Sequence, residues 1–203
     1  MRKEINAVIF DMGGVLLKTI NPAPREVLAK RFGVTRAELE AFIFMSETSL
    51  RSEVGELSDK EHWEFALRHF NQPVDDYLAV YDEYFSGDAI DQELLGFAVS
   101  LKSEYRLGLL SNAWVNARTQ LNKHFDFIDA FDVAVFSSEV GMRKPGQAIF
   151  KLMLEKMGVK AGNAVFIDDM LSNIEGAISA GMHAIRYTDT PKTIAEVKIM
   201  LSM

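Results

Sequence analysis

Carboxylates stand at the ends of two apolar stretches of this sequence. Asp11 closes the run VIF in VIFDMGGVL, and Asp168 and Asp169 close the run VFI in VFIDDMLSN. Asp and Gly are common turn residues, so Asp11 by itself fits an ordinary turn. Asp168 and Asp169 repel each other as neighbours, and one carboxylate would be enough to cap a following helix. The adjacent pair therefore indicates a cation nearby.

The ligands that the sequence offers favour a hard cation. The chain has no cysteine, which excludes disulfides and thiolate metal sites. Oxygen atoms from Asp11, Asp168 and Asp169 suit Mg²⁺, which takes one or two carboxylates plus a substrate phosphate and keeps several waters. Asn173, in the first turn of the following helix, has a side-chain amide that can orient one of the carboxylates.

Two further segments offer partners for an anion. Ser111 and Asn112 in LLSNAW carry a hydroxyl and an amide that can hydrogen-bond an anionic oxygen, although the same pair fits an ordinary helix N-cap. Lys144 in GMRKPG precedes Pro145, which suits the first position of a helix. A cation at a helix N-terminus opposes the helix dipole, so a bound phosphate explains Lys144 better than stability does.

Short apolar runs rich in β-forming residues predict the strands on which these residues lie. We expect strands at 5–10, 106–111, 132–137, 163–168 and 183–187, and helices at 114–125, 145–157 and 174–180. The runs are continuous rather than alternating, as in strands that are buried on both faces of a parallel sheet. The repeated strand–helix order predicts an α/β fold with a doubly wound, Rossmann-like parallel sheet. In such a sheet the strand ends meet at one edge, where ligands bind.

The segment 20–97 breaks this rhythm and reads as helices with no clear strand. Thr35 with Glu38, and Ser58 with Glu61, each match a capping box before an apolar-periodic stretch. We therefore predict an α/β core formed by 1–19 and 98–203, with a small all-helical cap at 20–97 inserted after the first strand. The chain returns to the core through a helix near 94–102.

Aromatic and histidine side chains of the insertion are expected to be structural. Trp63, Leu67 and Phe70 share one helical face. The aromatic residues expected to form the insertion's own core are Phe42, Phe44, Trp63, Phe65, Tyr77 and Tyr81. The four histidines of the chain show no metal-ligand spacing, and His62 and His69, one heptad apart, are expected on a helix surface.

The composition and net charge of the chain limit the kinds of partner that it can bind. The chain has 203 residues, of which 48% are hydrophobic and 25% charged, as in an ordinary globular protein. A formal net charge of −7 argues against a general affinity for nucleic acid or anionic membrane. No stretch approaches the ~20 apolar residues of a spanning helix, and the N-terminal apolar run is too short for a signal peptide. We expect a cytoplasmic protein, and the residues leave its oligomeric state open.

The four motifs, in this order, resemble those of the haloacid dehalogenase-like hydrolases, in particular the phosphatases with a small helical cap inserted after the first motif. The matching residues are Asp11 in DMGGV, Ser111 in LLSN, Lys144 in RKP, and Asp168, Asp169 and Asn173 in DDMLSN. The resemblance covers nearly the whole chain. Within the family, VGMRKPGQAIF and DDMLSNIEGAISAG are most similar to sugar-phosphate phosphatases that act on glucose 1-phosphate.

The resemblance implies hydrolysis of a small phosphate monoester. The Asp11 carboxylate would attack phosphorus in line and form an aspartyl-phosphate that water then hydrolyses. The implied Mg²⁺ ligands are the Asp11 side chain, the Gly13 carbonyl, Asp168 and, directly or through water, Asp169. Ser111, Asn112 and Lys144 would hold the phosphoryl oxygens.

Gly13 departs from the usual pattern of these phosphatases. Most of them carry a second Asp at this position, which protonates the leaving alkoxide, and its loss costs on the order of 10²- to 10⁴-fold. The glucose 1-phosphatase-like subgroup resembles this chain in having Gly here. Gly13 either tolerates a side chain or requires a positive φ. Two other functions stay open: 2-haloacid dehalogenation, against which the paired acids of DDM argue, and a non-catalytic binding protein of the same fold.

Overall fold

A computed structural model, which describes residues 5–203, contains a five-stranded parallel sheet with the strand order β5-β4-β1-β6-β7. Its strands are β1 (Ala7–Phe10), β4 (Arg106–Ser111), β5 (Val133–Phe136), β6 (Ala164–Asp168) and β7 (His183–Arg186). The predicted fold class and all five predicted strands are confirmed. β1 lies in the middle of the sheet, where Phe10 pairs with Leu109 of β4 and with Ile167 of β6.

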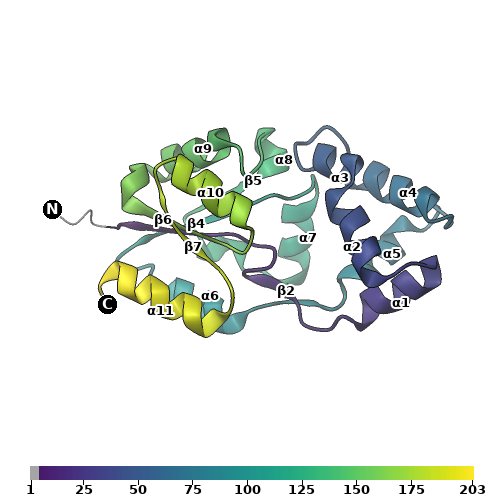
Figure 1. Cartoon of the computed structure of the whole chain (residues 1–203), viewed down its shortest axis with the longest axis horizontal. Helices are drawn as coiled ribbons and strands as arrows, with labels where there is room; N and C mark the ends of the chain where they lie inside the picture. Colours follow the sequence, from purple (N-terminus) through teal and green to yellow (C-terminus); the bar gives the residue numbers. More distant parts are fainter. Residues whose placement is uncertain (1–4) are drawn as a thin grey trace.

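Helices cover both faces of this sheet (Figure 1). The apolar core on one face includes side chains from α6 (Gln92–Ser100), α7 (Ala117–His124) and α11 (Thr190–Leu201). The core on the other face includes side chains from α9 (Gln147–Met157) and α10 (Leu171–Ser179). All four residues of β1 are buried, because the strand is covered on both faces, which explains its continuous apolar sequence. Within residues 5–203, none of the helices has both the length and the hydropathy that crossing a membrane requires.

Three helix starts differ from the predicted ones. α7 begins at Ala117, three residues after the predicted start at 114. α9 begins at Gln147 rather than Pro145, because Pro145 belongs to a turn in which the Gly146 N–H donates to the Arg143 carbonyl over 3.0 Å. α10 begins at Leu171, three residues before the predicted start at 174. Asn173 therefore lies in the first turn of α10, as the sequence predicted.

A second cluster of helices lies beside the sheet and has its own core (Figure 1). These cap helices are α1 (Ala23–Phe32), α2 (Arg36–Met45), α3 (Glu47–Ser52), α4 (Asp59–His69) and α5 (Tyr77–Phe85). Both predicted capping boxes are present, at the starts of α2 and α4. The boundaries at 19/20 and 97/98 stay a prediction, although Leu94 and Ala98 of α6 both pack in the core on the sheet.

The expectation of no strand in 20–97 is wrong. β3 (Asp88–Ile90) lies within this segment and pairs antiparallel with β2 (Leu17–Thr19), which comes directly before the segment. Each strand has three residues, too few to show a period in the sequence. The remaining short elements are α8 (Ser137–Val140) and two 3₁₀ turns at Ile128–Ala130 and Ala161–Asn163.

Three side chains of the cap helices lie elsewhere than predicted. His62 is fully buried instead of exposed, with Nε2 3.0 Å from the Ile43 carbonyl and Nδ1 2.9 Å from the Thr48 hydroxyl. These two bonds explain the burial, because they satisfy both ring nitrogens. Phe44 and Phe65 are 38% and 46% exposed, so they lie at the margin of the cap core rather than inside it.

Candidate active site

Three acidic side chains meet at the carboxyl edge of the sheet. Asp11 follows β1, Asp168 ends the neighbouring strand β6, and Asp169 comes next. Each offers a carboxylate oxygen, and these oxygens lie within 4.8 Å of one another. Asp11 and Asp168 are buried and Asp169 is half-buried. Hard oxygen donors at this spacing, taken out of bulk water, fit the requirements of Mg²⁺.

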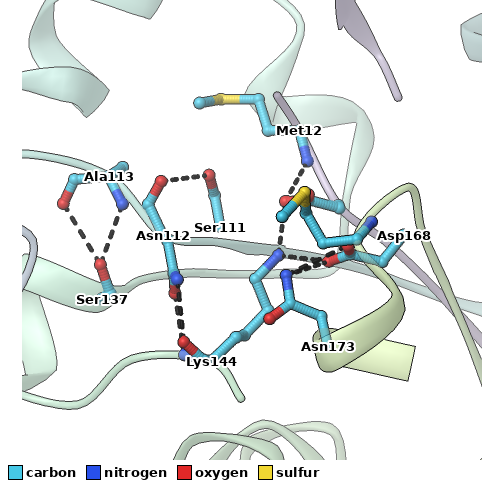
Figure 2. A network of polar contacts seen from close by, with 10 residues as sticks. Met12, Ser111, Asn112, Ala113, Ser137, Lys144, Asp168 and Asn173 are labelled. Carbon is cyan, nitrogen blue, oxygen red and sulfur yellow. Dashed lines mark hydrogen bonds and ion pairs between the residues drawn. The ribbon is translucent and has the colours of Figure 1, made fainter. Parts of the chain in front are cut away.

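Lys144 lies between two of these acids (Figure 2). Its Nζ is 2.6 Å from Asp11 Oδ1 and 2.7 Å from Asp168 Oδ2. The lysine is 1% exposed, so its charge is held almost entirely by protein groups. A buried cation is costly unless it is paired, and the two carboxylates supply the pairing.

Burial dominates the electrostatics of this cluster. Burial raises the pKa of Asp11 to about 8; the charge of Lys144 lowers it in part, and the charge of Asp168 raises it further. Burial alone would lower the pKa of Lys144, but Asp11 and Asp168 attract its charge and leave the pKa raised. Burial and the neighbouring Asp168 raise the pKa of Asp169. A bound divalent cation would favour the ionised form of each carboxylate.

Asp168 is fixed by two donors besides Lys144 (Figure 2). The Asn173 side-chain amide donates to Oδ1 over 3.1 Å and to Oδ2 over 3.0 Å. The backbone N–H of Met170 also donates to Oδ1, over 2.8 Å. Asn173, in the first turn of α10, therefore holds the Asp168 carboxylate in one orientation.

Ser111 and Asn112 leave β4 beside this cluster, and the side chain of Asn112 has a different partner from the expected one (Figure 2). Asn112 Nδ2 donates to the Lys144 carbonyl over 3.0 Å, and Oδ1 accepts from the Lys144 N–H over 2.8 Å. One hydrogen of Nδ2 is given to the Lys144 carbonyl, and the other remains for an anion, as does the backbone N–H of Asn112. The expectation that Asn112 holds a phosphoryl oxygen therefore stays a prediction. Ser111 is buried, and its hydroxyl donates to the Asn112 carbonyl over 3.2 Å.

The two glycines after Asp11 differ in their constraints. Gly14 has a φ of +81°, and a Cβ placed there would lie 2.7 Å from Asp169 Oδ2. Gly13 has no such positive φ, and a Cβ there would have no atom within 4 Å. Of the two possibilities that the sequence left open for Gly13, the structure favours the first: Gly13 has room for a side chain and does not require a positive φ. Gly14 has no such room.

Sequence reasoning missed the contacts that the cap helices make near Lys144. Glu53, which follows α3, accepts a 2.7 Å hydrogen bond from Arg143 Nε, although 90 residues separate the pair. Arg143 next to Lys144 was the available signal, because two adjacent cations need acidic partners. The role of Ser137 was also missed. Its hydroxyl accepts a hydrogen bond from the Ala113 N–H over 2.9 Å, and nothing in the sequence indicated this contact.

The parallel sheet, covered by helices on both faces, defines an α/β protein with an acidic site at the ends of its central strands. A family model described as haloacid dehalogenase-like hydrolase matches residues 5–181. The chain belongs to this family of hydrolases.

Relatives of known description include phosphatases. The chain is 27% identical to sesquiterpene phosphatase astK of Aspergillus oryzae (strain ATCC 42149 / RIB 40), over 98% of this chain and 97% of that protein. It is 28% identical to a phosphorylated carbohydrates phosphatase of Thermotoga maritima, over 89% of this chain and 84% of that protein. It is also 29% identical to acyl-CoA dehydrogenase family member 10 of Mus musculus, but spans only 19% of that protein's length.

Solved structures share the fold. A HAD family enzyme of Bacteroides thetaiotaomicron, in complex with magnesium and inorganic phosphate, superposes with a TM-score of 0.76. The match covers 91% of this chain and 94% of that chain at 22% identity. At this identity the likeness shows the fold alone.

Proposed function

We propose that the protein is a Mg²⁺-dependent phosphatase that hydrolyses a small phosphate monoester through an aspartyl-phosphate at Asp11. The observation that carries the proposal is the meeting of three carboxylates with the buried Lys144 at the centre of the sheet edge. A structural role alone would not require this buried charge, because apolar residues could fill the same space at lower cost.

We infer a role for each residue of the cluster. When bound, Mg²⁺ would be held by Asp11, Asp168, Asp169 and the Gly13 carbonyl, and would neutralise charge on the phosphoryl oxygens. Asp11 Oδ1 already accepts from the Met12 N–H over 2.7 Å and contacts Lys144 Nζ. Among the described residues no donor contacts Oδ2, so we assign the attack on phosphorus to that oxygen.

The chemical steps follow from this assignment. A bond forms between Asp11 Oδ2 and phosphorus while the bond from phosphorus to the ester oxygen breaks, and that oxygen leaves with the electron pair. Water then attacks the aspartyl-phosphate, which releases inorganic phosphate and restores the carboxylate. Lys144 and the Ser111 hydroxyl would hold the phosphoryl oxygens, so catalysis rests mainly on positioning and charge neutralisation.

We propose a sugar phosphate such as glucose 1-phosphate as the substrate. The Thermotoga maritima relative is described as acting on phosphorylated carbohydrates. An anomeric oxygen is also a good leaving group, which suits a site with glycine at position 13, where a general acid is usual.

A phosphate ester with an apolar leaving group is the second candidate. The Aspergillus oryzae relative, which this chain matches over nearly its whole length, is described as a sesquiterpene phosphatase. Met170 and Leu171, directly after Asp169, are 47% and 51% exposed, and exposed apolar side chains beside a polar site favour apolar ligands.

The decisive experiment measures phosphate release from sugar phosphates, nucleotides, an isoprenoid phosphate and an aryl phosphate at several Mg²⁺ concentrations. We expect Mg²⁺-dependent release that Asp11→Asn abolishes without changing the melting temperature by more than a few degrees. Asp75→Asn, at an exposed position of the cap helices' connecting loop, is the control and should match the wild type. Turnover of a 2-haloacid without Mg²⁺, or near-wild-type release by Asp11→Asn, would contradict the proposal.

A further inference from the structure

Trp114 comes from the sheet edge but packs among the cap helices. It follows the end of β4 by three residues, yet its indole stacks on Phe44 of α2 at 5.8 Å and lies 4.8 Å from the His62 ring of α4. Within residues 5–203, it is the one buried member of the cap core that does not come from the cap helices or the residue after α4. The indole Nε1 donates to Ser49 Oγ of α3 over 3.1 Å. The indole is thus anchored in the cap by packing and by a hydrogen bond.

The backbone around Trp114 is held from both sides. The Trp114 carbonyl accepts from the Ser138 hydroxyl of α8 over 3.0 Å. Two residues later, the Asn116 N–H donates over 3.1 Å to Asp59 Oδ1 at the start of α4. The segment between Ser111 and Asn116 therefore has hydrogen bonds to α4 of the cap and to α8 of the core.

This segment also fixes the position of Lys144. Asn112, two residues before Trp114, binds the Lys144 backbone through both its donor and its acceptor. Lys144 in turn bridges Asp11 and Asp168. The hydrogen bond from Trp114 to Ser49, the two backbone steps from Trp114 to Asn112, and the bonds from Asn112 to Lys144 thus link the cap to the charged centre.

We infer that Trp114 is a positioning residue: the cap, by holding its indole, sets the placement of Ser111, Asn112 and Lys144 against the phosphoryl group. The inference rests on the proposed phosphatase function. It gives the cap a part in the chemical step beyond covering the site, so a loosened indole lowers kcat more than it changes KM or the Kd for Mg²⁺.

The chain supplies a matched control for this inference. Its two tryptophans, Trp63 and Trp114, are both buried in the cap core, with ring centroids 6.2 Å apart. Among residues 5–203, Trp63 Nε1 has no hydrogen-bond partner, so Trp63, on α4, packs against the Trp114 ring but makes no hydrogen bond to the segment that holds Lys144. Replacing either tryptophan by Phe removes similar apolar area, but only Trp114→Phe breaks a hydrogen bond to α3.

The first experiment compares Trp114→Phe with Trp63→Phe in steady-state kinetics on the best phosphate ester, with Mg²⁺ titrated separately. We expect Trp114→Phe to lower kcat about 10- to 100-fold, the size that a small misplacement of reacting groups produces, with the Kd for Mg²⁺ unchanged. Trp63→Phe should have a kcat within about twofold of the wild-type value, even if its melting temperature is lower. Ser49→Ala, a gentler change to the same hydrogen bond, should lower kcat in the same direction. Equal kcat in the two Phe variants, or an unchanged kcat in Ser49→Ala, would overturn the inference.

A second experiment needs no activity and separates this inference from the proposed function. Residues that share contacts give non-additive effects on stability, whereas independent ones give additive effects. We expect the melting-temperature losses of Trp114→Phe and Asn112→Ala to be non-additive, and those of Trp63→Phe and Asn112→Ala to add. Additive losses in both pairs would overturn the inference even if the wild type is an active phosphatase. If the wild type releases no phosphate from any ester, the proposed function fails, and non-additivity confined to the Trp114 pair would still support the contact path.

Discussion

Gly13, two residues after the proposed nucleophile, should make the rate of turnover depend on the leaving group. Without a carboxylic acid at this position, the ester oxygen leaves without a protein proton donor, so the rate should fall as leaving-group basicity rises. We expect aryl and anomeric phosphates to turn over faster than a primary-alcohol phosphate such as glucose 6-phosphate. The check is a plot of log kcat against leaving-group pKa with chemistry rate-limiting; a flat plot would mean that another group already donates the proton.

Gly13→Asp should narrow this difference between leaving groups, because it restores a proton donor where the structure leaves open space for a Cβ. Its melting temperature should stay near that of the wild type. Gly14→Ala is the contrasting variant. It should destabilise the folded state, because Gly14 has a φ of +81° and a Cβ there would lie against the Asp169 carboxylate. Loss of folding in Gly13→Asp, with Gly14→Ala unaffected, would contradict the placement of these two residues.

His62 makes the folded state sensitive to acid. Burial lowers the pKa of His62 to about 4 from 6.5, although the hydrogen bond to the Ile43 carbonyl opposes the shift. As pH falls below 6.5 the unfolded chain binds the proton first, so stability is lost at about 1.4 kcal/mol per pH unit until pH reaches the folded-state value near 4. Above 6.5 the residue contributes no pH dependence.

Urea unfolding between pH 7 and 4.5 tests this prediction. We expect His62→Gln to lose less stability than the wild type over this range, although it starts from a lower value. His69→Gln, at an exposed position on the same helix, should follow the wild-type curve. Parallel curves for the wild type and His62→Gln would show that the imidazole is not buried in its neutral form.

At the level of elements, the cap helices and the loop before α9 are joined by the pair of Glu53 and Arg143. The Glu53 side chain is 12% exposed and that of Arg143 is 35% exposed. Burial raises the pKa of Glu53, while Arg143 and Lys144 lower it in part. Removal of the Arg143 cation therefore leaves a carboxylate in a poorly solvated position.

We predict that Arg143→Met lowers the free energy of unfolding by about 1–3 kcal/mol, the cost of an unsatisfied buried polar group. Adding Glu53→Gln should recover part of this loss, because the neutral amide is easier to bury. Urea unfolding of both single variants and the double variant measures the coupling. Strictly additive losses would mean that the two side chains do not interact.

The elements that the sequence predicted well are those with a strong local signal. The five strands of the parallel sheet read as short apolar runs, of which β1 and β6 are fully buried, and the Thr35 and Ser58 capping boxes fixed the starts of α2 and α4. β2 and β3 were missed because a three-residue strand has no measurable period and is stabilised by its partner alone. The start of α9 was misplaced because Asn112, far away in sequence, holds the backbone of Lys144 in the preceding turn.

For the whole molecule, Mg²⁺ binding should add to stability. A ligand that binds only the folded state at ~100 times its Kd contributes about 2.7 kcal/mol. For a chain of this length that corresponds to a rise in melting temperature of about 5–10 °C. Thermal unfolding with and without Mg²⁺ should show this rise in the wild type and in Asp75→Asn, and a much smaller one in Asp168→Ala. Equal rises in all three proteins would place the metal elsewhere.

The candidate site could be located from the sequence because each of its acids ends an apolar run, and parallel strands bring such ends to one edge. Asp11 and Asp168 were found in this way, Lys144 was found from its place before Pro145, and the structure brings the three together. The partners that hold them in place were not predictable. Asn112, Trp114 and Glu53 act through contacts between segments far apart in sequence, and only the folded chain brings those segments into contact.

The central position of β1 has a consequence for synthesis on the ribosome. β1 leaves the ribosome first, but its nearer partner β4 lies almost 100 residues later in the chain and β6 later still. At about 5–20 residues per second, the apolar segment AVIF waits about 5–20 seconds before either neighbour exists. During that interval the nascent chain exposes an unpaired apolar strand on both edges, which is the kind of segment that chaperones bind and that aggregates at high expression. Slower translation of the cap-coding region therefore lengthens the period of greatest risk, whereas the same slowing after β6 does not.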